Sequence, residues 1–281
     1  MKYIKEQSHK IVVITNSFIF LERIGHKLEQ NIWKNGIHDW DGFLKHDKIN
    51  GLSRHRKLYY NRKILNARKA LYNFDSGYFT SILPQSETWR LYDFFRDDSV
   101  FLDIETTGLS KEYDDITVFG LYNGINTKIM IKGVNLDYSI LKKELGKYKL
   151  IVTFNGASFD IPFIEKRYPN LLPKIPNFDV RSVSNMLGLK GGLKVIEKNL
   201  GIKRSNIVEN FYGGDALTLW RMYKATGDDY YLNLLVEYNE YDIINLKTVA
   251  EHCVKNMKEK LFNTHFLSNT LARHSSLKDN P

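Results

Sequence analysis

A change of pattern near residue 98 limits the folds that this chain can adopt. After it, short apolar runs separated by turn signals predict strands at residues 100–104, 116–122, 127–131, 150–154 and 177–180. Helical periodicity predicts helices at residues 138–145, 160–167, 192–200, 216–224 and 229–258. Three successive strands, followed by alternating helices and strands, indicate an α/β fold with a mixed five-stranded sheet flanked by helices.

The residues before this change predict a small helical module over residues 1–95, ahead of a main domain at 96–260. Asp39 is expected to cap a short helix of this module. Two longer helices are expected to bury apolar faces, made of Ile24, Leu28, Ile32 and Trp33 in the first and of Ile64, Ala67, Leu71 and Phe74 in the second. Residues 261–281 are polar and predict a mobile tail.

The positive charge of the chain is concentrated in the expected helical module. The formal net charge is +9, and residues 45–69 contain nine Lys or Arg against a single acid, Asp47. Such a cluster suits a polyanionic partner and is a candidate for binding a nucleic-acid duplex or strand. A solvated helix face gives the same pattern. Residues 21–29 resemble half of a degenerate helix-hairpin-helix element, with Arg23 where a glycine is usual. A plain packing module is an equally good interpretation.

Cysteine usage and hydropathy indicate a cytoplasmic protein without a membrane segment. Cys253 is the only cysteine, so no disulfide can form within the chain. The apolar stretch near residues 11–21 is short and contains Thr15, Asn16 and Ser17, which is typical of neither a signal peptide nor a membrane span.

Two carboxylates at the end of the first expected strand are the most informative residues for function. Alternation along a strand sends Asp103 and Glu105 to the same face and Ile104 to the other. Carboxylates so close together repel each other unless cations bridge them, and hard divalent ions prefer such oxygen ligands. A structural pair at a strand end is the alternative.

Further acids follow at positions where a sheet and a helix can bring them near this pair. Asp160 comes after the fourth strand, where it could also cap the next helix. Tyr238 and Asp242 are four residues apart in a helical stretch and therefore share one face. Each feature alone is common and mostly structural.

Together these residues resemble the tyrosine-type DEDD exonucleases of the DnaQ-like group, and more closely the YprB-like nucleases of RNase H fold. The resemblance covers roughly residues 85–255. Besides the acids, it includes Gly191-Gly192-Leu193-Lys194, Glu197, Leu200-Gly201-Ile202-Lys203-Arg204, Leu219-Trp220 and Tyr238-Asn239. In the histidine variant of the group a His precedes the last Asp by five positions. Glu237 stands there in this chain, so the tyrosine form fits better.

The resemblance implies an RNase H-like fold and a two-metal exonuclease that acts 3′ to 5′ on DNA or RNA and releases 5′-nucleotides. Two Mg²⁺ or Mn²⁺ ions would be bridged by Asp103, with Glu105 and Asp242 completing the site of the attacking water. Asp160 would support the second ion. Tyr238 would hydrogen-bond the water or the scissile phosphate. The partner would be a nucleic acid with a single-stranded 3′ end.

Candidate substrate contacts lie around these residues, and two other functions stay open. The substrate candidates are Thr106, Asn155, Lys194 and Arg204. A first alternative is a nuclease-fold module that binds nucleic acid without cutting it, and a second is a structure-specific endonuclease. The complete carboxylate set argues against a pure binder, because clustered negative charge repels phosphates.

Overall fold

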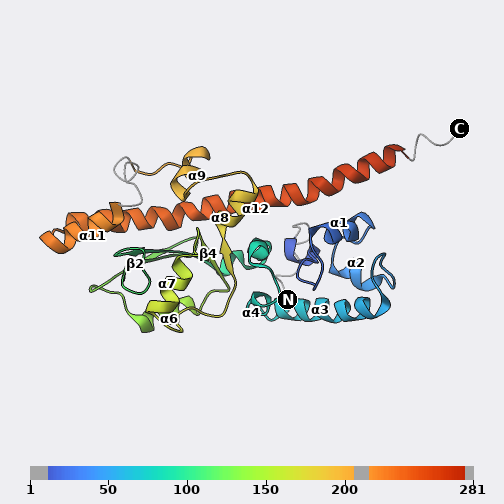
Figure 1. Ribbon diagram of the computed structural model, residues 1–281, viewed down its shortest axis with the longest axis horizontal. Coiled ribbons are helices and arrows are strands. Elements are labelled where there is room, and N and C mark those ends of the chain that lie inside the picture. The colour runs from blue at the N-terminus through green and yellow to red at the C-terminus, as the bar shows by residue number, and fades with distance from the viewer. Residues whose placement is uncertain (1–11, 206–214, 276–281) are drawn as a thin grey trace.

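The structure, a computed structural model, describes residues 12–205 and 215–275, with side chains over 12–205 and 216–261. The outer ends of the predicted module and tail, residues 1–11 and 276–281, lie outside the described residues. Figure 1 shows a twisted sheet with helices on both faces at one end of the molecule and a group of helices at the other. The predicted class, an RNase H-like α/β fold with N-terminal helices, is confirmed.

The sheet has five strands in the order β3-β2-β1-β4-β5. The strands are β1 (Ser99–Thr106), β2 (Ile116–Tyr122), β3 (Thr127–Ile131), β4 (Leu150–Thr153) and β5 (Asn177–Asp179). β1 runs antiparallel to β2 and parallel to β4. β3 pairs antiparallel with β2, and β5 pairs parallel with β4. All five strands were predicted to within a few residues. The β2–β3 turn closes where Asn123 Oδ1 accepts the backbone N–H groups of Ile125 and Asn126.

The helices of the sheet domain also follow the predicted segments, except at the end of the last one. They are α6 (Tyr138–Leu145), α7 (Asp160–Arg167), α8 (Val180–Met186), α9 (Leu193–Asn199), α11 (Asp215–Thr226) and α12 (Asp229–Ser275). α8 was not predicted, because its few residues follow β5 without a break. α12 was expected to end at residue 258, but its helical backbone continues into the segment that was predicted as a tail.

The N-terminal module consists of short helices and one long basic helix. They are η1 (Val13–Asn16), α1 (His26–Lys34), α2 (Trp40–Lys45), α3 (Arg54–Tyr72), α4 (Gly77–Thr80), η2 (Gln85–Leu91), α5 (Tyr92–Phe95) and η3 (Arg96–Asp98). Asp39 caps α2 as predicted, since its side chain accepts the backbone N–H of Gly42 at 2.7 Å.

One prediction for this module is wrong. Phe74 was expected to share the buried face of α3, yet α3 ends at Tyr72 and Phe74 is 51% exposed. The cause is local: Phe74 adopts a left-handed conformation with φ 52°, which turns the chain away from the helix axis. Its ring then packs on Phe94, with the ring centroids 5.8 Å apart.

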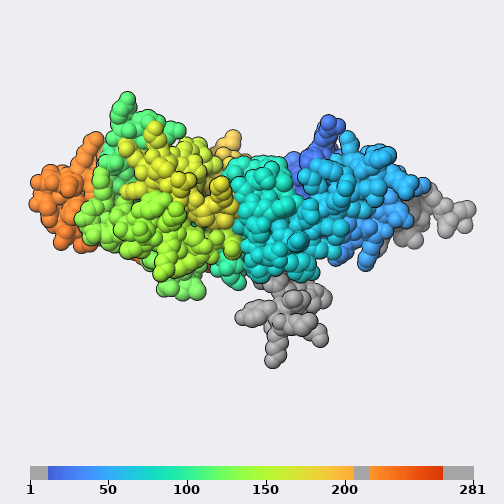
Figure 2. Space-filling model, turned by 90° about the horizontal axis from the view of Figure 1, so that it is seen from below, coloured from blue at the N-terminus to red at the C-terminus, as the bar shows by residue number. Residues whose placement is uncertain are grey.

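A single apolar core joins the module to the sheet. α12 runs past both parts of the molecule, as Figure 1 shows, and it packs on β1, β2, α8 and α1. The ring of Tyr92 lies edge-on to Phe101 of β1 and Phe178 of β5. Figure 2 shows the same arrangement as an elongated body, with the N-terminal helices at one end and α11 at the other. The domain boundary near residue 95 stays a prediction, because this core crosses it.

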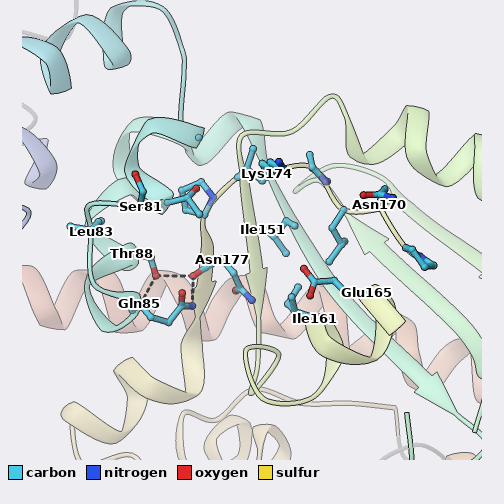
Figure 3. A pocket seen from close by; sticks show the side chains of 17 residues that line it. Ser81, Leu83, Gln85, Thr88, Ile151, Ile161, Glu165, Asn170, Lys174 and Asn177 are labelled. Carbon is cyan, nitrogen blue, oxygen red and sulfur yellow. Dashed lines mark hydrogen bonds between the residues drawn. The ribbon is translucent and has the colours of Figure 1, made fainter. Parts of the chain in front are cut away.

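A cleft of about 820 Å³ lies at the junction, between η2, α4, α7 and the chain leading into β5 (Figure 3). At its edge the side chains of Gln85 and Thr88 each donate a hydrogen bond of 2.8 Å to the carbonyl oxygen of Asn177. These two bonds attach η2 to the edge strand β5. None of the predicted catalytic side chains lines this cleft.

A buried ionic network holds the module together around Arg90, which is 1% exposed. Its guanidinium donates to Glu29 of α1 at 3.0 and 3.1 Å, to Glu87 at 2.6 Å and to Ser17 at 2.9 Å. Glu29 Oε1 also accepts the backbone N–H of Phe18 at 2.7 Å. The network therefore connects three segments of the module, and its two carboxylates have one fully buried cation between them.

None of the helices within residues 12–205 and 215–275 has the length and apolar character needed to cross a membrane.

We expect the substitution Arg90→Met to lower the free energy of unfolding by about 3–5 kcal/mol, because Glu29 and Glu87 would lose their buried cation and only the exposed His26 ring, 3.2 Å from Glu87, would stay beside them. Urea denaturation followed by circular dichroism measures the change. Arg68→Met is the matched control. It breaks an ion pair with Asp41, whose side chain is 69% exposed, and should cost at most about 1 kcal/mol. Equal losses of stability in the two variants would contradict a central role for the network.

Candidate metal centre

The strand β1 places the first two carboxylates. Asp103 and Glu105 point to one face of the sheet, and Ile104 between them is 4% exposed in the core on the other face. Both carboxylates are half-buried, so the group they form stays open to solvent on one side. Regular pairing with β2 is interrupted between Glu105 and Thr106, and such irregularities commonly lie next to functional sites.

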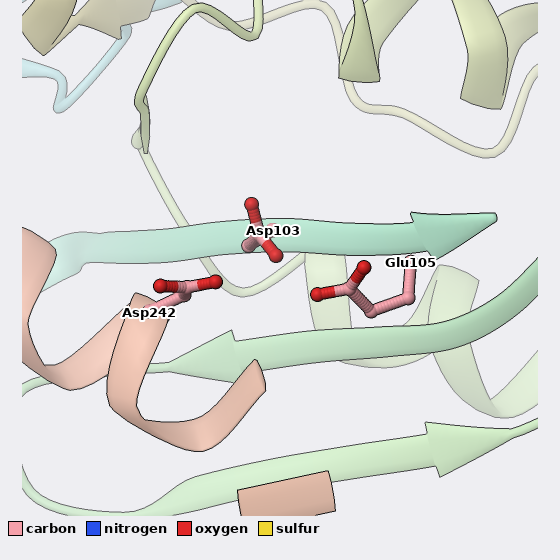
Figure 4. A group of neighbouring side chains, drawn as sticks. All are labelled: Asp103, Glu105 and Asp242. Atoms are coloured by element: carbon pink, nitrogen blue, oxygen red, sulfur yellow. The ribbon is translucent and has the colours of Figure 1, made fainter. Parts of the chain in front are cut away.

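The helix α12 brings the third carboxylate. Oxygen atoms of Asp103, Glu105 and Asp242 all lie within 4.8 Å of one another. Figure 4 shows the two strand residues side by side and Asp242 approaching them from the helix. Asp242 is far from the two strand residues in the sequence, and the packing of α12 across β1 and β2 brings it to them. The geometry suits a cation with oxygen ligands.

The electrostatics of this group are those of crowded negative charge. Burial raises the pKa values of Asp103 and Glu105 well above their usual range, and the neighbouring carboxylates raise them further. Burial likewise raises the pKa of Asp242 to about 6, although Arg204 acts in the opposite direction. A bound divalent ion would therefore favour the deprotonated forms of all three acids.

Asn239 holds one of these carboxylates in place. Its Nδ2 donates a 2.8 Å hydrogen bond to Asp103 Oδ2, and the residue is fully buried. Gly120 on β2 stands directly opposite Asp103, and a Cβ atom there would lie 2.0 Å from Asn239 Oδ1. The missing side chain at Gly120 thus makes room for the amide. Neither residue was singled out as a site residue, although Asn239 lies three positions before Asp242 on the same helix face.

Arg204 is engaged inside the protein. It is 8% exposed and donates two hydrogen bonds to Glu197, of 2.6 and 2.7 Å, and a further short one to Asp242. Its Nη1 has no hydrogen-bond partner among the described residues. The predicted contact of Arg204 with substrate phosphates stays a prediction. Glu197, named only as part of the resemblance, is 2% exposed and fixes the guanidinium from α9.

Tyr238 lies beside the carboxylates on α12 and is 7% exposed. Burial raises the pKa of its hydroxyl, and the charges of Asp242, Glu105 and Asp103 raise it further, so the side chain keeps its proton. The ammonium of Lys194, on α9, lies 4.2 Å from the centroid of the Tyr238 ring. Lys194 is therefore next to the centre, as a substrate contact requires, while the contact itself is untested.

Asp160 approaches the centre from the start of α7 but is not part of the group of three. Its Oδ1 accepts the backbone N–H of Ile104 at 3.2 Å, and burial raises its pKa to about 7. The alternative role as helix cap is not seen, since Phe159 occupies the cap position and Asp160 is the first residue of the helix. The hydrogen bond to Ile104, the residue between Asp103 and Glu105, places Asp160 near both, and its charge raises their pKa values further.

The other two predicted substrate contacts have local roles in the structure. Thr106 Oγ1 donates to the carbonyl of Gly108 at 2.6 Å. Asn155 turns the chain after β4 with φ 66°, and its backbone N–H donates to Asp179 at 2.8 Å. Asp179 also accepts the backbone N–H of Arg181. Both substrate roles remain predictions.

Comparison with known proteins agrees with this fold. A family model described as the RNase_H superfamily matches residues 100–254. No curated protein matches significantly. Among solved structures, the family B DNA polymerase of the hyperthermophilic archaeon Pyrobaculum calidifontis is 14% identical, with a TM-score of 0.45 over 55% of this chain and 24% of the polymerase. This chain thus spans about a quarter of the polymerase.

Brucella melitensis NrnC with bound Mg²⁺ is 18% identical, with a TM-score of 0.37 over 68% of this chain and 92% of NrnC. These scores are low, and the assignment to a family depends on the family model alone. Because that model covers more than half of the chain and includes β1 and the described carboxylates, the chain belongs to the RNase H superfamily.

Proposed function

We propose that this protein is a divalent-metal-dependent 3′–5′ exonuclease that hydrolyses phosphodiester bonds of DNA or RNA with two Mg²⁺ or Mn²⁺ ions. The supporting observation is the group of three carboxylates, within 4.8 Å of one another and open to solvent on one side. The 3′–5′ direction comes from the resemblance to the tyrosine-type DEDD nucleases.

The donor set fits such ions. It consists of carboxylate oxygens, whose pKa values are raised by burial and by the charges of neighbouring carboxylates. Asp103 would hold both ions, Glu105 and Asp242 would complete one site, and Asp160 would support the other. When bound, the ions would lower the pKa of water and neutralise charge that develops on the phosphate.

The chain's own residues prepare the centre for substrate. Asn239 fixes the orientation of Asp103, and Arg204 does the same for Asp242. The protonated hydroxyl of Tyr238 donates a hydrogen bond to the scissile phosphate or orients the attacking water. Lys194 above the Tyr238 ring attracts the incoming strand.

Cleavage of a labelled oligonucleotide should stop in EDTA and resume when Mg²⁺ or Mn²⁺ is added. The isosteric variant Asp103→Asn should cleave about a thousandfold more slowly, since losing a metal ligand removes several kcal/mol of transition-state stabilisation. Single-turnover product ladders measure both effects.

Asp115→Asn provides the matched control for this experiment. Its side chain is 47% exposed and pairs with Lys132, so the same charge is removed outside the centre. This variant should keep wild-type activity. Full activity of Asp103→Asn, or metal-independent cleavage, would overturn the assignment. Tight binding without any turnover in either metal would leave a nuclease-fold binding module.

An exonuclease requires a free end. We therefore expect linear single-stranded DNA to be shortened one nucleotide at a time from its 3′ end, and a circular strand of the same sequence to stay intact. Denaturing gels of 5′-labelled and circular substrates, run side by side in Mn²⁺, measure this. Linearisation of the circle would favour a structure-specific endonuclease instead.

Gly120→Ala should reduce both activity and thermal stability, because the new methyl group overlaps the amide of Asn239 and displaces it from Asp103. A decrease of about 1–3 kcal/mol in unfolding free energy is expected for such overpacking. The double variant Gly120→Ala with Asn239→Ala should regain stability but not activity. Gly25→Ala, where a Cβ meets nothing within 4 Å, is the control. Additive decreases of stability in the double variant would exclude the steric explanation.

A further inference from the structure

A second cleft, of about 740 Å³, lies in the N-terminal module, well away from the carboxylates. It is formed by the end of α2, the segment after it and the first turns of α3. One rim is a tight turn in which Leu52 N–H donates to the carbonyl of Ile49, with Gly51 at φ 83°. In Figure 1, α2 and α3 lie at the end of the molecule opposite α11.

Lys57 is the most unusual residue of this cleft. It is 4% exposed, and its ammonium donates to the amide oxygen of Asn61 at 2.6 Å. The ring of Phe43 lies 4.8 Å from the same ammonium. The hydrogen-bond partner is thus a neutral amide, and burial lowers the pKa of Lys57. An ammonium has three protons to donate, so this buried charge retains donor capacity for an anion.

Two further cations line the cleft. Lys48 and Arg54 are both exposed, as is His46, and Asp47 is the only acid among the described residues that line it. The cleft adjoins the N-terminus of α3, a helix of 19 residues whose dipole places partial positive charge there. The charge of Asp47 acts against burial on the pKa of Lys57, but it is a single acid among three cations, Lys48, Arg54 and Lys57. The side chains of Leu44 and Leu52 form an apolar wall beside these charges.

We propose that this cleft binds a backbone phosphate of a nucleic-acid strand, with Lys57 as the buried donor, Arg54 and Lys48 at the opening, and a sugar or base against the apolar wall. The identity of the ligand rests on the proposed function, because a strand is the polyanion that a nuclease meets. The cleft is a separate binding subsite, and it holds the strand at a distance from the carboxylates.

Binding of a labelled single-stranded oligonucleotide to the full chain, measured by fluorescence anisotropy in EDTA, tests this subsite without cleavage. Lys57→Met and Arg54→Gln should each weaken binding about five- to tenfold. The slope of log affinity against log salt concentration should become shallower by about 0.7 for each phosphate that no longer meets a cation. Lys69→Gln removes an exposed charge of the same helix outside the cleft and should change affinity less than about twofold.

The outcomes separate this subsite from the catalytic proposal. Unchanged affinity and salt slope in both cleft variants would overturn the subsite, whatever the activity of Asp103→Asn. If the cleft variants bind the oligonucleotide more weakly but the wild-type protein shows no cleavage, the subsite is supported and the proposed nuclease activity is contradicted. If Lys57→Met does not fold, Arg54→Gln alone decides, since Arg54 is exposed. Saturation by 5′-AMP at concentrations where the oligonucleotide does not bind would exclude a strand as the ligand.

Discussion

Crowding of negative charge at one point of the sheet is the constraint around which this structure is built. Two carboxylates about 4.8 Å apart repel each other by roughly 3 kcal/mol at the effective dielectric constant typical of protein sites. The fold reduces this repulsion with a buried guanidinium, Arg204, and a buried amide, Asn239. Neither group fully neutralises the acids, as their raised pKa values indicate. The remaining imbalance favours binding of cations, and it costs folding free energy until a cation binds.

The same constraint explains the length and packing of α12. The proposed metal binding would require Asp242 to lie close to Asp103, and this in turn would require α12 to pack rigidly on the sheet. Gly120 provides close approach at one point, and the apolar core provides the remaining contact area. That core includes Phe101 of the sheet, Trp40 of the module and Val249 of the helix. The N-terminal helices thus support α12 from one end, which couples the geometry of the metal centre to the stability of the module.

The five strand segments and most of α12 followed from sequence because they depend on apolar periodicity and turn residues, which are local. Asp103 and Glu105 were also accessible, since alternation along a strand places both on one face and their spacing matches the resemblance. Asn239 and Gly120 were missed as a pair because their relation is a contact across 119 positions of sequence, visible only when β2 and α12 are in place. Arg204 shows the opposite difficulty. An arginine near a predicted active site suggests a phosphate contact, but burial and two carboxylate partners are properties of the folded chain. Phe74 was placed wrongly because periodicity does not reveal where a helix ends.

The separation of charge between the two parts of the molecule has a physical consequence for any nuclease of this design. A centre made of carboxylates repels a phosphate backbone until metal ions are bound, so the affinity for a strand has to come largely from elsewhere. In this chain the basic residues of α3 and the cleft around Lys57 lie in the module, and the acids that define the centre lie on β1 and α12. The shared core holds these two regions at a fixed distance from each other. A strand bound at the module would therefore be held in a fixed position relative to the carboxylates. Binding and hydrolysis would then depend on different residues. A substitution in the cleft would weaken binding without changing the carboxylates, and a substitution of a carboxylate would slow hydrolysis without changing the cleft.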